Sequence, residues 1–187
     1  MGRWQPNSRG RLEQAALALY AERGFENTTV AEIAKRAGLT ERTFFRHFAD
    51  KREVLFGGGE LQQLLVNSVA GAPDSAAPMD VVAAGLEAAG ATLQDRREFA
   101  RQRQSIIAAN PSLQERELIK LASLASAIAE ALCQRGIADP IASLTAETGI
   151  AVFKTAFERW IDGSNDQDFS HLIRESVEEL KLITGGA

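Results

Sequence analysis

The sequence predicts an all-α protein of about nine helices, with a three-helix helix-turn-helix domain ahead of a larger helical bundle. Alanine, leucine and glutamate are plentiful, and no stretch alternates valine, isoleucine and threonine as a β-strand would. Apolar residues make up 45% and charged residues 25% of the 187 residues, a balance typical of globular chains. Proline is scarce, with five residues, so it leaves room for long helices.

The first helix is expected over residues 8–23. Ser8 is placed to cap its start, and Gly24 is placed to end it, because glycine readily adopts the left-handed conformation found after helices. Phe25 follows as an anchor into a small core. The apolar stripe of this helix recurs at helical spacing and consists of Leu12, Ala15, Ala16, Leu19 and Tyr20.

Two short helices joined by a tight turn follow. Thr29 and Glu32 have the spacing of a capping box, so a second helix begins there, and Gly38 closes it. Thr40 is placed to cap a third helix over residues 41–47. Two short helices joined by a turn that contains glycine form a helix-turn-helix unit.

The third helix is expected to turn Phe44 and Phe48 inward. Asp50 and Glu53 repeat the capping-box spacing, so a fourth helix is expected to begin at Lys51. Three capping signals within so few residues make this arrangement specific.

The rest of the chain reads as further helices. An amphipathic stretch ends near Ala70, and a loop rich in glycine, alanine, proline and serine follows it. Asn110-Pro111 and Asp139-Pro140 each read as a cap followed by a first-turn proline. The expected helices are 79–91, 93–109, 111–135, 139–162 and 168–184. We therefore expect two domains, residues 1–56 and residues 57–187.

Gly57-Gly58-Gly59 lies at the border between these domains. Three glycines inside a helix would cost about 2–3 kcal/mol relative to alanine. They act either as a hinge that reorients the first domain or as a plain helix break, and the sequence does not separate the two.

Charge is unevenly distributed along the chain. Residues 1–56 carry ten Lys/Arg against seven Asp/Glu, whereas residues 57–187 carry eleven against eighteen, within a net charge of −4. A basic head on an acidic body suits a protein that offers one end to phosphates.

The remaining composition bears on the compartment. Cys133 is the only cysteine, so an internal disulfide is excluded. Residues 1–10 are polar and basic and do not resemble a secretory signal. No apolar run approaches the roughly 20 residues that a membrane-spanning helix needs. We therefore expect a cytoplasmic protein with no membrane partner.

Residues 24–55 resemble the DNA-binding domain of TetR-type repressors. The residues that carry the resemblance are Gly24-Phe25, Thr28-Thr29-Val30, Ile33-Ala34, Ala37-Gly38-Leu39-Thr40, Thr43-Phe44-Phe45-Arg46-His47-Phe48, Lys51 and Leu55. The resemblance implies a homodimeric, ligand-responsive repressor that a small-molecule effector releases from a palindromic, double-stranded operator. It also implies that the remainder is a helical effector-binding and dimerisation domain.

A second, weaker resemblance concerns the C-terminal part. Residues 103–116, with Asn110-Pro111-Ser112-Leu113 among them, and Glu158-Arg159-Trp160 resemble the subgroup of this family with acyl-CoA-like ligands. The effector implied is acyl-CoA-like or another apolar or anionic compound.

The third helix is the candidate for reading DNA bases. With Phe44 inward, the side chains left outward or flanking are Thr40, Glu41, Arg42, Phe45 and Arg46. Arg42 is the candidate for guanine, because its guanidinium matches the O6 and N7 acceptors. A solvated surface charge is the alternative for Arg42.

By resemblance, another set of residues contacts backbone phosphates: Thr28, Thr29, Thr40, Thr43, His47 and Lys51. Family members usually have tyrosine where this chain has Phe45, so one phosphate hydrogen bond is expected to be missing, although the ring can still contact a thymine methyl. For His47 the alternative is a residue favoured at a helix C-terminus. Arg3, Arg9 and Arg11 add candidate backbone or minor-groove contacts.

The candidate effector residues lie in the second domain. Arg97, Arg101 and Gln104 fall on one helical face and suit an anionic ligand, although a solvated face paired with acidic neighbours remains open. Phe153, Phe157 and Trp160 are candidates for a pocket lining, and aromatics at helical spacing are more often core.

The final two helices are the expected dimer interface, with packing inside one subunit as the alternative. The residues of their apolar stripes are Ile150, Phe153, Ala156, Phe157 and Trp160 on one helix, and Leu172, Val177, Leu180 and Ile183 on the other.

No constellation of residues predicts catalysis, a metal site or a cofactor, so we do not expect an enzyme. Two other functions compete with ligand-responsive repression. One is a scaffold whose helix-turn-helix contacts proteins, which the basic head disfavours. The other is an activator or global DNA-binding regulator without an effector.

Overall fold

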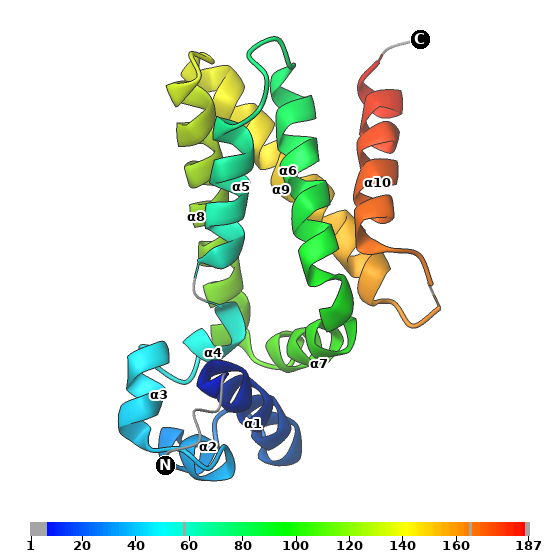
Figure 1. Cartoon of the computed structure of the whole chain (residues 1–187). Coiled ribbons are helices and arrows are strands. Elements are labelled where there is room, and N and C mark those ends of the chain that lie inside the picture. The colour runs from blue at the N-terminus through cyan, green and yellow to red at the C-terminus, as the bar shows by residue number, and fades with distance from the viewer. Residues whose placement is uncertain (1–6, 58, 165, 186–187) are drawn as a thin grey trace. The chain divides into compact units, whose positions relative to one another are not determined.

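The computed structural model describes residues 7–57, 59–164 and 166–185. Within this part of the chain there are ten α-helices, one short 3-10 helix and no β-strand (Figure 1). The helices are α1 (Ser8–Arg23), α2 (Val30–Arg36), α3 (Glu41–His47), α4 (Glu53–Phe56), α5 (Glu60–Ala70), α6 (Pro78–Leu93), η1 (Gln94–Arg96), α7 (Arg97–Ala108), α8 (Pro111–Gln134), α9 (Asp139–Ile161) and α10 (Phe169–Thr184).

The all-α prediction is confirmed, and the number of α-helices is ten where about nine were expected. The chain is interrupted between α4 and α5, because Gly57 and Gly59 have φ angles of 68° and 89°, which continue no right-handed helix. Gly58, the middle glycine of Gly57-Gly58-Gly59, lies outside the described residues.

The chain divides into two compact units, residues 1–58 with 102–117 and residues 59–101 with 118–187. The expected border at 56/57 is close to the first break. Residues 102–117, expected in the second domain, group instead with the first unit. The reason is a set of contacts to α4: Arg116 binds the Glu53 carboxylate at 2.6 Å, and Arg103 donates to the Leu55 carbonyl and lies over the Phe56 ring.

Helix α1 begins at Ser8 as predicted, but its cap is Asn7 rather than Ser8. The Asn7 side chain accepts a hydrogen bond from the Gly10 amide at 2.8 Å. Gly24 ends the helix with φ 83°. The predicted stripe is entirely buried: Leu12, Ala15, Ala16, Leu19 and Tyr20.

Helices α2 and α3 have the predicted caps. The Thr29 hydroxyl accepts from the Glu32 amide, and the Glu32 carboxylate accepts from the Thr29 amide, so the capping box is complete. Thr40 accepts from the Thr43 amide at 3.2 Å and starts α3 at Glu41.

Helix α4 begins at Glu53 rather than at Lys51. The Asp50 carboxylate accepts from the amides of Arg52 and Glu53, which gives half of the predicted capping box. The other half is not formed in the predicted way, because the Glu53 carboxylate binds Arg116.

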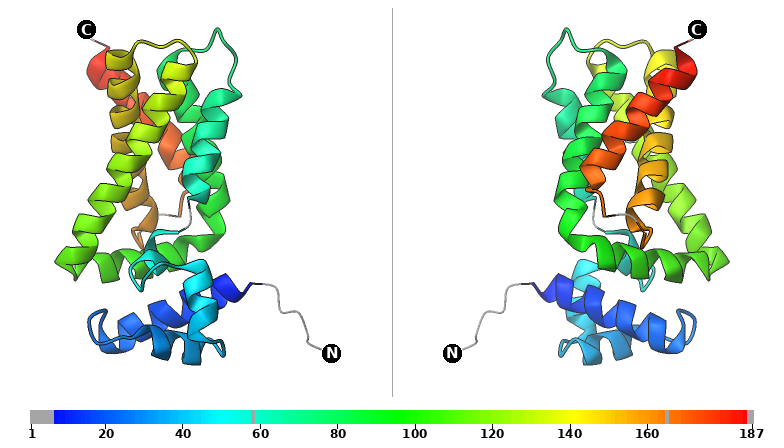
Figure 2. Two further views of the ribbon diagram at one scale, coloured as in Figure 1. Left: turned by 90° about the vertical axis from the view of Figure 1, so that its left-hand side faces the viewer. Right: turned by 90° about the vertical axis from the view of Figure 1, so that its right-hand side faces the viewer.

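In the second unit α6 packs against α5, α9 and α10 (Figures 1 and 2). Small residues permit these close crossings. A Cβ atom on Gly149 of α9 would lie 2.5 Å from Val82 of α6, and one on Gly90 of α6 would lie 2.9 Å from Ile173 of α10. An aromatic cluster joins the C-terminal half of α9 to the start of α10. Its members are Phe153, Phe157, Trp160 and Phe169.

Candidate nucleic-acid interface

Helix α3, the candidate for reading DNA bases, rests on two buried rings. Phe44 is 0% exposed and Phe48 is 3% exposed, and their ring centroids lie 5.5 Å apart. The two phenylalanines therefore fix which face of α3 points away from the core. Arg42 and Arg46 lie on the opposite, exposed face, as helical geometry requires.

These two arginines differ from the other described arginines of the head. Neither Arg42 nor Arg46 makes a hydrogen bond or ion pair with a residue that the structure describes. By contrast, Arg23 binds Glu32 at 2.9 Å and Arg36 binds Glu22 at 2.6 Å. The guanidinium groups of Arg42 and Arg46 are thus left for an external acceptor.

Three of the predicted phosphate-contacting threonines are at the starts of α2 and α3. The hydroxyls of Thr29 and Thr40 serve as caps, and Thr43 lies 3.1 Å from Thr40, oxygen to oxygen. All three stay accessible or half-buried, so capping leaves room for an external contact.

Thr28 is different, because it is only 1% exposed. Its hydroxyl donates to the Gly24 carbonyl at 2.9 Å. The structure therefore removes the Thr28 side chain from the accessible surface and gives it a role in closing the turn after α1.

Lys51 also has partners inside the head. Its ammonium donates to the carbonyls of Phe25, Glu26 and Thr28 at 2.9, 3.2 and 3.1 Å, and it lies 4.4 Å from the centre of the Phe25 ring. The Tyr20 hydroxyl in turn donates to the Lys51 carbonyl at 2.6 Å. Lys51 thus holds the turn between α1 and α2, whatever else it contacts.

His47, at the end of α3, is tied to the start of α1. Its Nε2 lies 2.7 Å from the Ser8 hydroxyl. Partial burial, and then the charges of Arg46 and Arg9, hold the pKa of His47 below its ordinary value. The lowered pKa favours the neutral imidazole of His47, which is suited to a hydrogen bond rather than to an ion pair.

The basic residues near the N-terminus are partly used inside the head. Arg9 binds Glu13 at 3.1 Å and lies over the Phe48 ring, and Arg11 donates to the Ala37 carbonyl. Arg3 lies outside the described residues.

The structure separates the candidate effector residues. Arg97 donates to the Asp162 carbonyl at 2.8 Å and Arg101 to the Ile161 carbonyl at 3.0 Å, so both lie at the C-terminal end of α9 together with Trp160. Gln104 belongs to the first unit and lies within 3.5 Å of the Glu117 carboxylate.

The aromatic candidates are mostly core. Phe153 and Trp160 are buried and Phe157 is half-buried. The indole Nε1 of Trp160 is buried and has no acceptor among the described residues. Of the six predicted residues, four therefore gather at the end of α9: Arg97, Arg101, Phe157 and Trp160.

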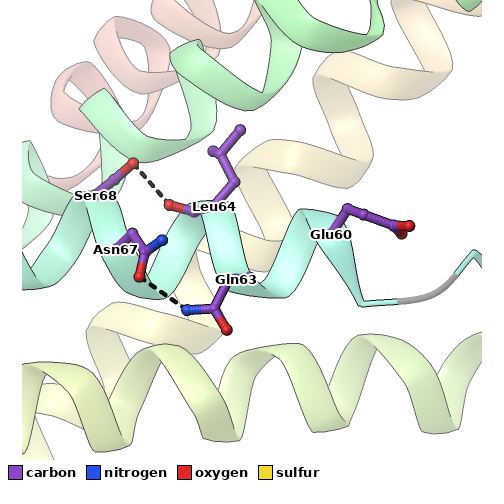
Figure 3. A pocket seen from close by; sticks show the side chains of 5 residues that line it. All are labelled: Glu60, Gln63, Leu64, Asn67 and Ser68. Carbon is purple, nitrogen blue, oxygen red and sulfur yellow. Dashed lines mark hydrogen bonds between the residues drawn. The ribbon is translucent and has the colours of Figure 1, made fainter.

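Two surface hollows of the second unit are lined by other residues. One, of about 590 Å³, runs along α5, where the Gln63 and Asn67 amides are hydrogen-bonded at 2.8 Å (Figure 3). Its lining residues are Glu60, Gln63, Leu64, Asn67 and Ser68. The other, of about 350 Å³, lies between α6 and α10 and is lined by Asp80, Ala83, Ala84, Glu87, Arg174, Val177, Glu178 and Lys181.

The predicted dimer stripes pack mostly inside the subunit. Among the α9 residues, Ile150, Phe153, Ala156 and Trp160 are buried, and on α10 Leu172 and Val177 are buried. α9 and α10 pack against α6 and against each other. Packing inside one subunit was the alternative that the sequence left open for these stripes. Ile183 alone of the predicted stripes is well exposed, at 81%.

Another apolar surface was missed. Ile141 and Leu144 of α9 are 56% and 70% exposed, and Ala151 is exposed on the same helix. Together with Thr148 and Thr155 they recur at alternating steps of three and four residues, which is a heptad pattern. The signal in the sequence was a second apolar stripe on a helix that already had one.

In the described ranges, no group of three or more His, Cys, Asp or Glu side chains is placed to hold a metal ion. No helix in that part of the chain has the length and apolarity to cross a membrane.

Comparison with known proteins matches both halves of the chain. The family model of "Bacterial regulatory proteins, tetR family" matches residues 13–56, and that of the "MftR C-terminal domain" matches residues 76–183. The putative mycofactocin biosynthesis transcriptional regulator MftR of Mycobacterium tuberculosis is 28% identical over 170 residues, which cover 86% of this chain and 83% of the relative.

Two solved structures have the same fold. FadR of Thermus thermophilus, a TetR family transcriptional repressor in complex with lauroyl-CoA, has a TM-score of 0.54 at 22% identity over 92% of both chains. FadR of Bacillus subtilis in complex with stearoyl-CoA has a TM-score of 0.63 at 17% identity over 91% of this chain and 96% of that one.

Proposed function

The chain belongs to the tetR family of bacterial regulatory proteins and is a DNA-binding transcriptional regulator, and we propose that it is a repressor which a small-molecule effector releases from a palindromic operator. Regulators of this family bind operator DNA, dimerise and bind small-molecule effectors. They are not enzymes, and we assign no reaction to this chain. We place it in the cytoplasm, where an operator is accessible.

One observation supports the assignment of α3 to DNA binding. Arg42 and Arg46 project from this helix, which two buried phenylalanines anchor, and no described residue binds either arginine. Arginine donates two parallel hydrogen bonds to guanine O6 and N7, so Arg42 is assigned to a guanine in the major groove. Thr29, Thr40, Thr43 and His47 are assigned to backbone phosphates, which position the helix without reading sequence.

The test of this surface is binding by Arg42→Ala to the duplex that the wild-type protein selects from a random library. We expect a loss of about 1–3 kcal/mol, or roughly 5- to 150-fold, on the selected duplex and a smaller loss on scrambled DNA. Arg36→Ala is the control, since it removes an equal charge that Glu22 already binds. Equal affinity of wild type and Arg42→Ala for both duplexes would contradict the assignment.

For the effector we propose a compound with an anionic group and an apolar part, of which an acyl-CoA is the first candidate. Arg97, Arg101 and the half-buried Phe157 lie at one end of α9 and offer both chemistries. The two FadR structures with acyl-CoA support the choice of probe. A different apolar or anionic compound is the alternative.

Release from the selected duplex tests this class directly. Lauroyl-CoA and stearoyl-CoA are expected to lower the fraction of DNA bound in a gel shift, whereas coenzyme A alone leaves it unchanged. Arg101→Gln is expected to raise the lauroyl-CoA concentration needed for release. Persistence of the complex at all concentrations of both acyl-CoAs would reject the class and leave repression itself untouched.

We further propose that a second copy of the chain covers the exposed stripe of α9. Two-fold symmetry of the dimer would match two half-sites of a palindromic operator. Ile141, Leu144 and Ala151 supply an unpartnered apolar face at the spacing of helix pairs.

A further inference from the structure

Phe45 is an apolar side chain on the DNA-binding helix that the fold leaves uncovered. It is 55% exposed, and in the described part of the first unit, residues 7–57 and 102–117, no other large hydrophobic side chain is exposed. Single exposed apolar side chains occur on most protein surfaces, so the kind of partner is inferred from the residues beside Phe45 on α3 and not from its exposure alone.

The ring cannot turn into the core, because the space beneath α3 is filled. Phe44 and Phe48 are buried there, and Phe45 is held edge-on against Phe44 with centroids 5.5 Å apart and planes at 82°. The Phe44 ring therefore supports one side of Phe45, and the rest of the Phe45 ring stays accessible to a partner.

The neighbours of Phe45 on the helix favour nucleic acid as the partner. Phe45 follows Arg42 by three residues, so their side chains lie on adjacent positions of one face of the helix. Arg46 is the next residue, and neither arginine has an acceptor among the described residues. A face that combines free guanidinium groups with one ring suits a polyanion rather than an apolar protein surface.

Phe45 has no hydroxyl, so it donates nothing to a phosphate. The apolar group that base edges present in the major groove is the 5-methyl group of thymine. On the basis of the proposed function, we propose that Phe45 is a specificity-determining residue whose ring packs on a thymine methyl within about two base pairs of the guanine that Arg42 reads.

The test replaces thymine by uracil, which removes the methyl group and keeps every hydrogen-bonding atom. The probe is the duplex that the wild-type protein selects from a random library, with each thymine changed singly to deoxyuridine. Wild type is expected to lose about fourfold in affinity at one position of each half-site, which corresponds to about 0.8 kcal/mol for one buried methyl-sized group. Other thymines are expected to show no change.

Protein variants then connect that position to Phe45. Phe45→Ala is expected to bind the thymine and uracil duplexes equally, whereas Phe45→Tyr keeps the ring and therefore the preference for thymine. Arg36→Ala is the control and is expected to keep the preference unchanged. Because Phe45 is exposed, the thermal unfolding midpoint of each variant is expected to match wild type.

The outcomes separate this inference from the proposed function. If the library yields no selected duplex, DNA-specific binding itself fails. If a duplex is selected but no uracil substitution weakens binding, the reading of thymine by Phe45 is wrong while the proposed function stands. A uracil penalty that persists in Phe45→Ala assigns the methyl contact to another residue and also overturns the inference.

Discussion

At the scale of single residues, the head uses several polar side chains for its own turns. Thr28 and Lys51 stand at positions that the family resemblance assigned to phosphates, yet both have internal acceptors. Lys51 binds three carbonyl oxygens after α1, and only that of Phe25 has a second donor among the described residues, the Thr28 amide at 3.3 Å. The residue types therefore showed that Thr28 and Lys51 are able to bind phosphate, but they did not show which groups these side chains bind in the fold.

Lys51→Met tests this internal role. Methionine keeps much of the apolar stem and removes the donors, so the free energy of unfolding is expected to fall by about 1–3 kcal/mol. Urea denaturation measures the change, and Lys35→Met, an exposed lysine on α2, is the control. Unchanged stability together with weakened DNA binding would show instead that Lys51 acts on phosphates.

At the scale of elements, close approach between helices depends on single glycines. Gly149 of α9 faces Val82 of α6, and a Cβ atom there would lie 2.5 Å from the valine Cγ1. Alanine is the better helix former by about 1 kcal/mol, so propensity and packing predict opposite effects at this position.

Gly149→Ala is expected to lower stability, because packing against Val82 outweighs helix propensity. The expected loss is about 1–3 kcal/mol in urea denaturation, as for other overpacked cores. Ser143→Ala, on the exposed side of the same helix, is expected to change stability by less than about 0.5 kcal/mol. A stabilised Gly149→Ala variant would mean that α6 and α9 separate at little cost.

The glycines before α5 interrupt the helix, and their role as a hinge is a hypothesis. Gly57 has φ 68° and ψ −177°, a conformation that other residues avoid, so alanine at this position is strained whether or not the segment moves. A loss of stability alone would therefore not identify a hinge. The test of a hinge is therefore effector-dependent release from DNA, compared between Gly57→Ala and wild type.

At the scale of the whole molecule, the proposed function needs a second copy of the chain, because a palindromic operator has two half-sites. α9 has two apolar faces, and the one buried against α6 and α10 is unavailable to a partner. The proposed contact is therefore the exposed face with Ile141, Leu144 and Ala151.

Leu144→Glu is expected to convert a dimer into a monomer at micromolar concentration, because it places a charge in the centre of the proposed contact. Light scattering gives the mass of each form. Leu118→Glu on α8 is the matched control, since Leu118 is similarly exposed at 62%. Dissociation of the Leu118→Glu variant, with Leu144→Glu still dimeric, would move the interface to α8.

The sequence by itself determined the caps of α2 and α3, although Asn7 rather than Ser8 caps α1 and α4 begins at Glu53 rather than at Lys51. The Thr29–Glu32 capping box, the Thr40 cap and the inward Phe44 were all predicted, because each depends on residues within about one helical turn of one another. The approximate ends of the later helices followed from prolines, glycines and spacing for the same reason, although the expected helix 93–109 is divided into η1 and α7.

Only the tertiary structure decided which partners each side chain meets. It showed that one face of α9 is covered and another is not, that Thr28 is buried, that Arg97 and Arg101 cap the end of α9, and that residues 102–117 group with the head. These outcomes depend on contacts between segments far apart in the sequence. Two apolar stripes on one helix have the same local pattern, and only packing decides which of them remains for a partner.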